Sequence, residues 1–452
     1  MIDLDSNVRM KEAYDIINNT DENVFVTGKA GTGKTTFLRY LIENCHKNMV
    51  VVAPTGIAAI NAGGTTIHSQ FGIPFGPFIP NIVGSTTYPG LDDYSLRPDK
   101  IETINKMEVL VIDEISMVRA DLLDAVNDVL CLHRHCSNKP FGGVQLVMIG
   151  DLYQLAPVVK SEEEAILDKY YKSCYFFDSI ALSMKGFQMV EFDYVYRQSD
   201  QDFVKILNEI RRGSISDESY ATLKEHYDPA FKPDEDNIVT VSTHNNKVQT
   251  INDARLSEID GDIIEFKGII KDDFKESNVP CDLSLQLKIG AQVMTVVNSS
   301  DGCFCNGSIG IIRDIDTSVP GDERIEIELD NGNIIKIGKY TWDNFKFDVD
   351  KESGKIKRES VGTYTQFPIR LAWAITVHKS QGLTFDKVIL DISRSFAPGQ
   401  IYVALSRCRT LENLHLISMF SKRQVKVDRK IVRFFRNKRE ESSLPETNEE
   451  DQ

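Results

Sequence analysis

The 452-residue sequence predicts an α/β protein made of two units of parallel β-sheet flanked by helices. Short apolar runs alternate with amphipathic helical patterns early in the chain and again after about residue 185, as expected for strands joined by right-handed helical crossovers. The runs are apolar throughout, which is typical of strands buried on both faces. A segment of apolar–polar alternation interrupts the second unit and predicts antiparallel strands.

The first unit is expected at 1–184. Its predicted strands lie at 23–28, 49–54, 108–114 and 145–151, with helices at 37–45 and 120–133. Residues 72–100 break this pattern, because 5 of the 15 prolines fall there and neither a helix nor a central strand tolerates them. We interpret 72–100 as a protruding insertion, with an irregular surface loop as the alternative. Its exposed aromatic residues are expected to include Phe75, Phe78, Tyr88 and Tyr94.

The second unit is expected at 185–292 plus 367–420. It contains a predicted helix at 203–213 that ends at a glycine, and predicted strands at 237–243, 372–377 and 387–392. Alternating segments at 291–298, 308–315 and 324–338 predict a small β-barrel at 293–366, inserted into the second unit. Asn331 and Gly332 form a strong hairpin signal within it.

The charge of the chain is unevenly distributed. A net charge of −15 argues against a nucleic-acid partner, but residues 440–452 hold 6 acids and no bases, whereas 421–439 hold 9 bases and 1 acid. An acidic protein can still bind a polyanion through a local groove. We expect a disordered acidic tail at 440–452 and a basic C-terminal helix at 421–439. This helix either binds DNA or, as we favour, docks on the second unit through Ile431, Val432, Phe434 and Phe435.

Targeting signals and disulfides are not indicated. The chain lacks an apolar run of the roughly 18 residues that a transmembrane helix needs. Its polar, acidic N-terminus is unlike a secretory or mitochondrial leader. The 8 cysteines show no disulfide framework. These features favour a cytoplasmic enzyme with no membrane partner.

Residues 28–35, GKAGTGKT, match a phosphate-binding loop (P-loop) between a predicted strand and a predicted helix. The glycines let the backbone close around phosphates, so that amides and the helix N-terminus face the β-phosphate. Lys34 is expected to reach the β- and γ-phosphates, and Thr35 to offer its hydroxyl to Mg²⁺. The nucleotide-binding residues expected here are Gly28, Ala30, Gly31, Thr32, Gly33, Lys34, Thr35 and Thr36.

Asp113 and Glu114 follow the apolar run VLVI. Asp113 is placed to bind Mg²⁺ together with Thr35, and Glu114 to polarise the attacking water. A carboxylate pair that caps the following helix is the alternative, which the upstream P-loop disfavours. Further catalytic groups are expected at the γ-phosphate. They are Gln154 in GDLYQLAPV, Arg197 in VYRQ and, delivered from the second unit, Arg407 in QIYVALSRCR.

Polar clusters follow two later strands. In TVHKSQG (376–382), Gln381 and Gly382 are expected to approach the nucleotide, and STHNN (242–246) is a similar strand end. The stretch APTGIAAINAGGTTIHSQFG (53–72) holds no charged residue, although 26% of the chain is charged. It is either a buried core segment or a surface kept clear for a ligand.

In their order, these motifs resemble those of superfamily 1 helicases, and most closely those of the Pif (petite integration frequency) family and the related RecD helicases. The matching segments are GKAGTGKT, APTGIAAINAGGTTIHSQFG, VIDEISM, GDLYQLAPV, YRQ, TVHKSQGLTFD and YVALSRCR, which extend from residue 28 to residue 409. Residues 124–151 resemble the segment between the second and third motifs that characterises the Pif family, with KPFGGVQ as the most specific part.

The resemblance implies two RecA-like motor domains with ATP at their interface, a wedge insertion in the first and an SH3-like insertion in the second. It implies ATP- and Mg²⁺-dependent 5′→3′ translocation on single-stranded DNA, and unwinding of duplexes, DNA–RNA hybrids and G-quadruplexes during replication, repair and recombination. It further implies a minimal, monomeric core of bacterial type, cytoplasmic and associated with the nucleoid, with replication or repair proteins as partners.

One position departs from the family pattern. Met10 stands about eighteen residues before the P-loop, where these helicases carry a glutamine that recognises adenine. Methionine can pack on a base but cannot make the paired hydrogen bonds of an amide, so backbone groups would have to supply selectivity for adenine.

In the uncharged stretch, Ile57, Ala58, Ala59 and Ile60 are expected to pack inward. Its glycines, hydroxyls and amides let a DNA backbone approach without ion pairs, and its histidine and phenylalanine can meet sugars or bases. The expected DNA-binding residues are Pro54, Thr55, Gly56, Gly64, Thr65, His68, Phe71, His244, Asn245, Thr376, Val377, His378 and Lys379.

Two alternatives remain open. The first is an ATP-driven single-strand translocase that remodels protein–DNA complexes with little unwinding, which a strand-displacement assay would distinguish. The second is a P-loop kinase or GTPase that acts on a small substrate. It predicts no stimulation by DNA, and it leaves the second α/β unit and its arginine motif unexplained.

Overall fold

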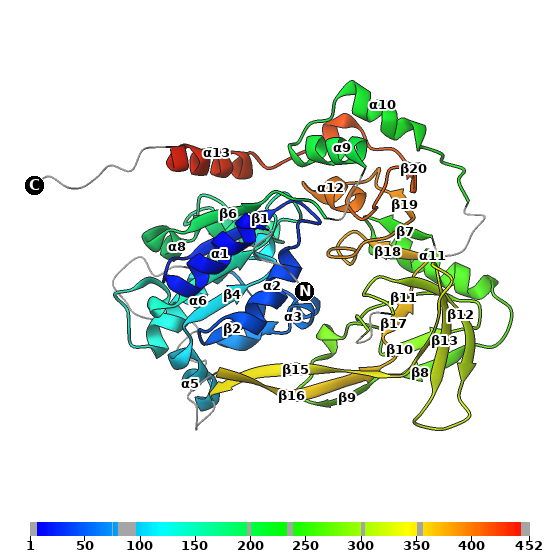
Figure 1. Cartoon of the computed structure of the whole chain (residues 1–452), viewed down its shortest axis with the longest axis horizontal. Coiled ribbons are helices and arrows are strands. Elements are labelled where there is room, and N and C mark those ends of the chain that lie inside the picture. The colour runs from blue at the N-terminus through cyan, green and yellow to red at the C-terminus, as the bar shows by residue number, and fades with distance from the viewer. Residues whose placement is uncertain are drawn as a thin grey trace, which may run out of the picture.

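The computed structural model describes residues 7–74, 76–79, 96–196, 200–232, 238–299, 303–349 and 356–443. Most of the insertion expected at 72–100, with Phe75, Tyr88 and Tyr94, lies outside these residues, as does Arg197. Of the tail expected to be disordered at 440–452, residues 440–443 are helical and the rest lies outside the described residues. The described residues form two lobes built on parallel sheets, and a β-rich insertion that belongs to the second lobe (Figure 1).

The first lobe is a parallel sheet with strand order β3-β2-β4-β5-β1-β6. Its strands are β1 (Val24–Gly28), β2 (Met49–Ala53), β3 (Thr65–Thr66), β4 (Val109–Ile112), β5 (Gln145–Ile149) and β6 (Gln188–Phe192). β1, β4 and β5 are buried along their whole length, as their apolar sequences require. The strands predicted at 23–28, 49–54, 108–114 and 145–151 are confirmed.

The helices of the first lobe include both predicted ones, as α2 and α6. They are α1 (Val8–Asn19), α2 (Lys34–Asn44), α3 (Gly56–Asn61), α4 (Ile67–Phe71), α5 (Pro98–Lys106), α6 (Ala120–His133), α7 (Ser161–Leu167) and α8 (Ile180–Lys185). β6 pairs with β1, so the first sheet continues past the boundary expected at residue 184. Because β6 is an edge strand with only two fully buried residues, its sequence lacks the continuous apolar run of its neighbours.

The second lobe holds another parallel sheet, with strand order β18-β7-β19-β20. Its strands are β7 (Val239–Ser242), β18 (Ala374–Thr376), β19 (Val388–Asp391) and β20 (Leu414–Ser418). Its helices are α9 (Gln201–Arg211), α10 (Asp217–Glu225), α11 (Asn245–Glu258) and α12 (Gln400–Leu405). The predicted helix at 203–213 and the predicted strands at 237–243, 372–377 and 387–392 are confirmed.

The insertion is larger than the single barrel expected at 293–366. A five-stranded antiparallel sheet joins β11 (Gln292–Thr295), β12 (Ile309–Asp316), β13 (Arg324–Leu329), β14 (Ile334–Ile337) and β17 (Ile369–Leu371), with the predicted hairpin between β13 and β14. β8 (Ile264–Lys267) and β10 (Ser284–Leu287) form a separate pair. β9 (Ile269–Asp272), β15 (Tyr340–Val349) and β16 (Ile356–Gln366) form an arm, which runs under the first lobe and touches α5 (Figure 1).

The sequence did not predict the arm, because an apolar–polar alternation indicates a strand but not the sheet to which that strand belongs. The side chains of Trp342 and Tyr364 stack at the root of the arm, with ring centres 5.4 Å apart, in a small core of their own. Strands with the same apolar–polar alternation therefore belong to two different sheets.

The C-terminal helix α13 (Arg429–Ser443) docks on the first lobe, and the predicted docking on the second unit is wrong. Ile431 and Phe435 join the core of the first lobe, and Phe434 stacks on Phe177 with ring centres 4.4 Å apart. The amphipathic pattern predicts an apolar face, but the aromatic residues of the first lobe decide where that face packs. Val432, expected to dock, is 48% exposed.

Among the residues that the structure describes, no helix combines the length and the apolar character needed to cross a bilayer.

Docking of α13 on the first lobe predicts a large effect of one substitution on that lobe. Phe435→Ala should lower the free energy of unfolding of the first lobe by about 3–5 kcal/mol, because it leaves a cavity beside Tyr153. Val432→Ala, on the exposed face, should cost less than about 0.5 kcal/mol. Hydrogen exchange of the β1 and β5 amides measures both effects. Equal protection in the two variants would contradict the docking.

Candidate active site

The P-loop follows β1 and leads into α2. Gly33, the N-cap of α2, is left-handed (φ 85°, ψ 15°), a conformation that favours glycine. A Cβ at Gly28 would lie 2.6 Å from the Phe192 carbonyl oxygen, so the loop closes tightly on β6. Lys34 Nζ donates to the carbonyl oxygens of Gly28 and Lys29 at 2.7 and 2.9 Å. The ammonium group is thus held over the loop, where phosphate oxygens can replace those acceptors.

The other residues of the loop have different surroundings. Thr32 is buried, and its hydroxyl donates to the Lys29 carbonyl oxygen at 2.9 Å. Thr35 and Thr36 are exposed in the first turn of α2. Gly31 has a φ of 77°. The loop therefore offers backbone amides and the Thr35 hydroxyl to a ligand, while Thr32 holds the loop together.

Asp113 and Glu114 follow β4 at the same edge of the sheet. Glu114 has a φ of 51°, an uncommon backbone conformation for a residue other than glycine. Although both residues keep some exposed surface, protein atoms packed around the carboxyls raise the pKa of Asp113 to about 6 and that of Glu114 to about 7. The charge of Asp113 adds to the rise at Glu114, and the Lys34 ammonium opposes both shifts.

The residues at this edge fit a nucleotide with a divalent cation. Thr35 and Asp113 supply the oxygen ligands that Mg²⁺ prefers. Thr27 Oγ1, before the loop, and Ser116 Oγ, after the carboxylates, are buried and lack a hydrogen-bond partner among the described residues. Two unsatisfied hydroxyls thus flank the loop and the carboxylates, beside the cationic Lys34 that a phosphate chain requires.

Contacts from the second lobe reach the carboxylates. Gln381 Nε2 donates to Glu114 Oε2 at 2.9 Å, while Gly382 is exposed with a φ of 81°. Arg407 is buried, and its guanidinium donates to the carbonyl oxygens of Val403 and Leu383 at 2.8 and 2.9 Å. Its positive charge nevertheless opposes the rise in the pKa of Glu114.

The structure thus brings Lys34, Asp113, Glu114 and Gln381 together. Arg407 lies near them but directs these hydrogen bonds to its own lobe. Gln154 is half-buried, with Nε2 3.4 Å from Asp151 Oδ2, and Arg197 lies outside the described residues.

Sequence reasoning missed several residues at this junction. Tyr402 of α12 accepts a hydrogen bond at its hydroxyl from the Ala30 amide of the P-loop, at 2.9 Å. Arg211 of α9 forms an ion pair with Asp151 of the first lobe, at 3.2 Å. Tyr402 and Asp151 lie inside the motifs that hold Arg407 and Gln154, so their motifs are the signal that could have found them. Arg211 carried no signal beyond its place at a helix end.

Met10 packs against the P-loop rather than facing outward. It is buried, and its Cε lies 2.9 Å from the position that a Cβ at Gly33 would occupy. The Tyr196 ring lies near the same point, and its hydroxyl accepts a hydrogen bond from Asn7 Nδ2 at 2.9 Å. Asn7 also caps α1, where its side-chain oxygen accepts a hydrogen bond from the Met10 amide at 3.0 Å.

The uncharged stretch at 53–72 divides into an outer and an inner part. Pro54, Thr55 and Gly56 retain exposed surface after β2, and Thr55 caps α3 through its hydroxyl. Ile57 is 40% exposed, which contradicts its expected inward packing, whereas Ala59 is buried. Ala58 and Ile60 are half-buried.

The inner part buries the side chains of several residues expected to contact DNA. Gly64 is buried so closely against β2 that a Cβ there would lie 2.2 Å from the Val51 carbonyl oxygen. Thr65 is buried in β3, and Phe71 belongs to the core of the lobe. His68 is half-buried, with Nδ1 3.0 Å from the Ile73 carbonyl oxygen, and burial lowers its pKa. Small and uncharged residues here serve close packing, because β3 and α4 fold back against β2.

The polar clusters of the second lobe lie at the ends of two paired strands, β7 and β18. His244 and Asn245 are exposed at the start of α11, as are His378 and Lys379 beyond β18. Although both side chains keep exposed surface, the protein atoms packed around them lower the pKa of His378 and that of Lys379. Thr376 and Val377, also expected at the DNA, are buried, so that only their backbone groups are available to a ligand at the surface.

Comparison with known proteins finds relatives along nearly the whole chain. The family model described as PIF1-like helicase matches residues 6–221, and the UvrD-like helicase C-terminal domain matches residues 371–414. The ATP-dependent DNA helicase PIF1 of Rattus norvegicus is 32% identical over 443 residues, which make up 95% of this chain and 64% of the rat protein. The chain thus spans less than two thirds of that relative. The ATP-dependent DNA helicase Pif1 of Bdellovibrio bacteriovorus is 31% identical, over 94% of this chain and 90% of that protein.

Solved structures of a Bacteroides Pif1 resemble the present fold. The complex with ADP-AlF4 is 43% identical, with a TM-score of 0.88 over 98% of both chains. The complex with single-stranded DNA is also 43% identical but has a TM-score of 0.69, over 96% of this chain and 97% of that chain. The present structure as a whole therefore superposes better on the complex with ADP-AlF4.

The raised pKa of Glu114 predicts how stability depends on pH. Between about pH 4.5 and pH 7 the folded chain binds more protons at Glu114 than the unfolded chain does, so stability falls as pH rises, by about 1 kcal/mol per pH unit. Glu114→Gln removes this loss, and its free energy of unfolding relative to wild type should increase from pH 5 to pH 8. Chemical denaturation without nucleotide measures it, with the exposed Glu43→Gln as a control that follows wild type. Parallel curves for wild type and Glu114→Gln would refute the expectation.

Proposed function

The chain belongs to the PIF1-like helicase family, and from this membership and the geometry of the site we propose that it is an ATP-dependent DNA helicase that moves 5′→3′ along single-stranded DNA. The hydrogen bond between Gln381 and Glu114 carries the proposal. It joins the carboxyl beside the P-loop to the second lobe. A change in the nucleotide site can therefore alter the position of one lobe relative to the other, which a motor requires.

ATP is the proposed substrate, and Mg²⁺ the proposed metal. Lys34 and the loop amides bind the phosphates, while Thr35 and Asp113 hold Mg²⁺, which when bound neutralises charge on the phosphate oxygens. Glu114 orients the attacking water and, as a general base, accepts a proton from it. The complex of the Bacteroides relative with ADP-AlF4 supports ATP as the ligand of this site.

The remaining catalytic groups act at the γ-phosphate. Gln154, Arg197 and Arg407 are proposed to stabilise the charge of the transferring phosphoryl group. Arg407 must then exchange its bonds to the Val403 and Leu383 carbonyl oxygens for bonds to phosphate. This exchange couples ATP binding to a rearrangement of the second lobe.

The DNA is proposed to lie across both lobes, on Pro54–Gly56, His244–Asn245 and His378–Lys379. These residues are at least partly exposed and follow strands β2, β7 and β18. The complex of the Bacteroides relative with single-stranded DNA supports such a ligand. Few of these residues are charged, so the grip relies on backbone amides and hydroxyls and permits release after each step.

Finer features of the proposal rest on the family alone. We propose that duplexes, DNA–RNA hybrids and G-quadruplexes are unwound, with a role in replication, repair and recombination and with proteins of those processes as partners. We also propose a monomer that works in the cytoplasm on nucleoid DNA.

Single-stranded DNA should stimulate ATP hydrolysis by the wild-type chain, and Glu114→Gln should abolish most of that activity. Loss of the group that orients water is expected to cost about 10²–10⁴-fold in kcat, because proton transfer is no longer assisted. Steady-state hydrolysis with and without single-stranded DNA measures both effects. Glu43→Gln, exposed on α2, is the matched control and should behave like wild type. Absence of DNA stimulation in the wild type would overturn the helicase proposal.

Direction of movement needs a separate measurement. Duplexes with a 5′ single-stranded tail should be unwound in the presence of ATP, whereas blunt duplexes and those with a 3′ tail should remain intact. Strand displacement by gel electrophoresis measures this. Unwinding from 3′ tails alone would reverse the proposed polarity. ATP-driven removal of a bound protein without strand displacement would favour the translocase instead.

A further inference from the structure

Arg211 of the second lobe reaches into the first lobe, where it is 8% exposed. Its Nη2 lies 3.2 Å from Asp151 Oδ1, and its Nη1 lies 3.8 Å from Glu191 Oε1. Its guanidinium carbon lies 4.3 Å from the centre of the Tyr153 ring. Tyr153 in turn stacks on Phe435 of α13, with ring centres 5.1 Å apart. An arginine of the second lobe therefore contacts two carboxylates and an aromatic ring of the first lobe.

A buried ion pair of this kind fixes the relative position of the two lobes but adds little to the free energy of unfolding. Desolvation of the two charges offsets most of their attraction, yet removal of one partner leaves an uncompensated buried charge. Arg211 Nε lacks a hydrogen-bond partner among the described residues, so the guanidinium is only partly satisfied. The contact therefore fixes the register of the two lobes at a small net gain in free energy.

Asp151 also organises the loop that carries Gln154. The Tyr153 amide donates to Asp151 Oδ1 at 3.1 Å, and Gln154 Nε2 lies 3.4 Å from Asp151 Oδ2. One carboxylate thus contacts Arg211 of the second lobe and the side chain of Gln154 in the first.

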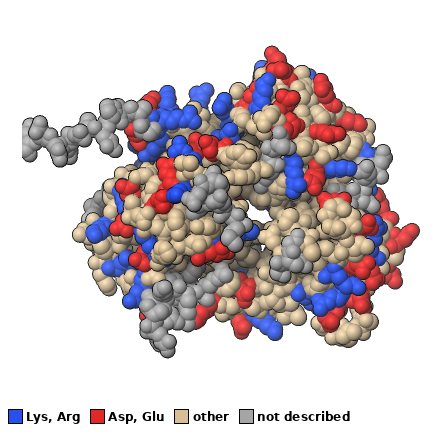
Figure 2. All heavy atoms as spheres, viewed as in Figure 1, with Lys and Arg blue, Asp and Glu red and all other residues tan. Residues whose placement is uncertain are grey.

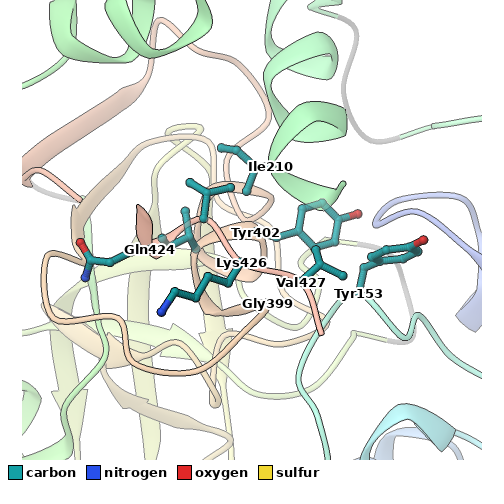
Figure 3. A pocket seen from close by; sticks show the side chains of 9 residues that line it. Tyr153, Ile210, Gly399, Tyr402, Gln424, Lys426 and Val427 are labelled. Atoms are coloured by element: carbon teal, nitrogen blue, oxygen red, sulfur yellow. The ribbon is translucent and has the colours of Figure 1, made fainter. Parts of the chain in front are cut away.

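The second lobe also contacts this loop through α12. Gly399, the N-cap of α12, lies so near that a Cβ there would be 2.1 Å from the Gln154 carbonyl oxygen. Figure 3 shows Tyr153, Gly399 and Tyr402 around a small cleft at this junction, with Val427 from the segment before α13. The loop at 151–154 is therefore held at its start by Arg211 and at its end by Gly399.

We propose that Arg211 is a positioning residue for ATP hydrolysis, which acts through Asp151 to tie Gln154 to the second lobe. The inference rests on the proposed function, in which Gln154 senses the γ-phosphate. Arg211 itself touches neither nucleotide nor DNA in this scheme. When the lobes close, the Arg211–Asp151 pair brings Gln154 into register, so hydrolysis is fast only in the closed arrangement.

The test compares Arg211→Met, which keeps length but removes charge, with Arg211→Lys and the double variant Arg211→Met/Asp151→Asn. Arg212→Met is the matched control, because Arg212 is the next residue and is exposed. The kcat and KM for ATP are measured at saturating single-stranded DNA, and thermal unfolding reports folding. The double variant removes both charges together, so it remains informative if a single variant unfolds.

For Arg211→Met, kcat should fall at least about ten-fold while the KM for ATP changes less than about two-fold, because geometry is lost but ATP binding is not. Arg211→Lys should recover part of the loss, and Arg212→Met should match wild type. The double variant should be no slower than Arg211→Met, since both residues act as one unit.

Separate outcomes distinguish this inference from the proposed function. Equal kcat for Arg211→Met and wild type would overturn the inference alone. So would a double variant much slower than Arg211→Met, because Arg211 would then act independently of Asp151, for example directly on phosphate. A wild-type chain without DNA-stimulated hydrolysis would overturn the proposed function and the inference with it.

Discussion

The hydrogen bond from Gln381 to Glu114 joins the two lobes at the carboxyl beside the P-loop. Glu114 follows β4, and Gln381 lies beyond β18, so each residue stands past the carboxyl end of a strand. Loops of a parallel sheet that bind ligands gather at that edge. The bond forms only when the two sheets present these edges to each other. The arm attaches away from this hydrogen bond (Figure 1), whereas α13 reaches the junction of the lobes elsewhere, where Phe435 stacks on Tyr153.

The strands and the phosphate-binding residues could be predicted because their signals are local. Lys34 and Glu114 each lie within a few residues of an apolar strand, and buried parallel strands have few alternative interpretations. Other features depend on contacts between distant residues. Phe71 lies in a stretch without charges, which describes an exposed track and a packed turn equally well. The apolar face of α13 predicts docking but not its partner. Arg211 meets Asp151 across 60 residues, and nothing near either residue signals the pair.

The placement of α13 also explains how an acidic chain carries a basic face. Its apolar side packs on the aromatic residues of the first lobe, which leaves Arg429, Lys430 and Arg433 exposed on the other side. Lys and Arg side chains gather in this part of the surface in Figure 2. Burial of the apolar face of α13 thus determines where its positive charges lie on the surface. The net charge of the chain is only a sum and gives no such position.

The chain crosses between the lobes twice, from β6 to α9 and back from β20 to α13. Both crossings lie along the upper side of Figure 1, whereas the arm touches α5 along the lower side without any covalent link. The lobes are therefore tied by the chain itself on the upper side, and by surface contact alone on the lower side. Cutting the chain between β20 and α13 would leave a single covalent connection between the lobes, whereas removing the tip of the arm would leave both.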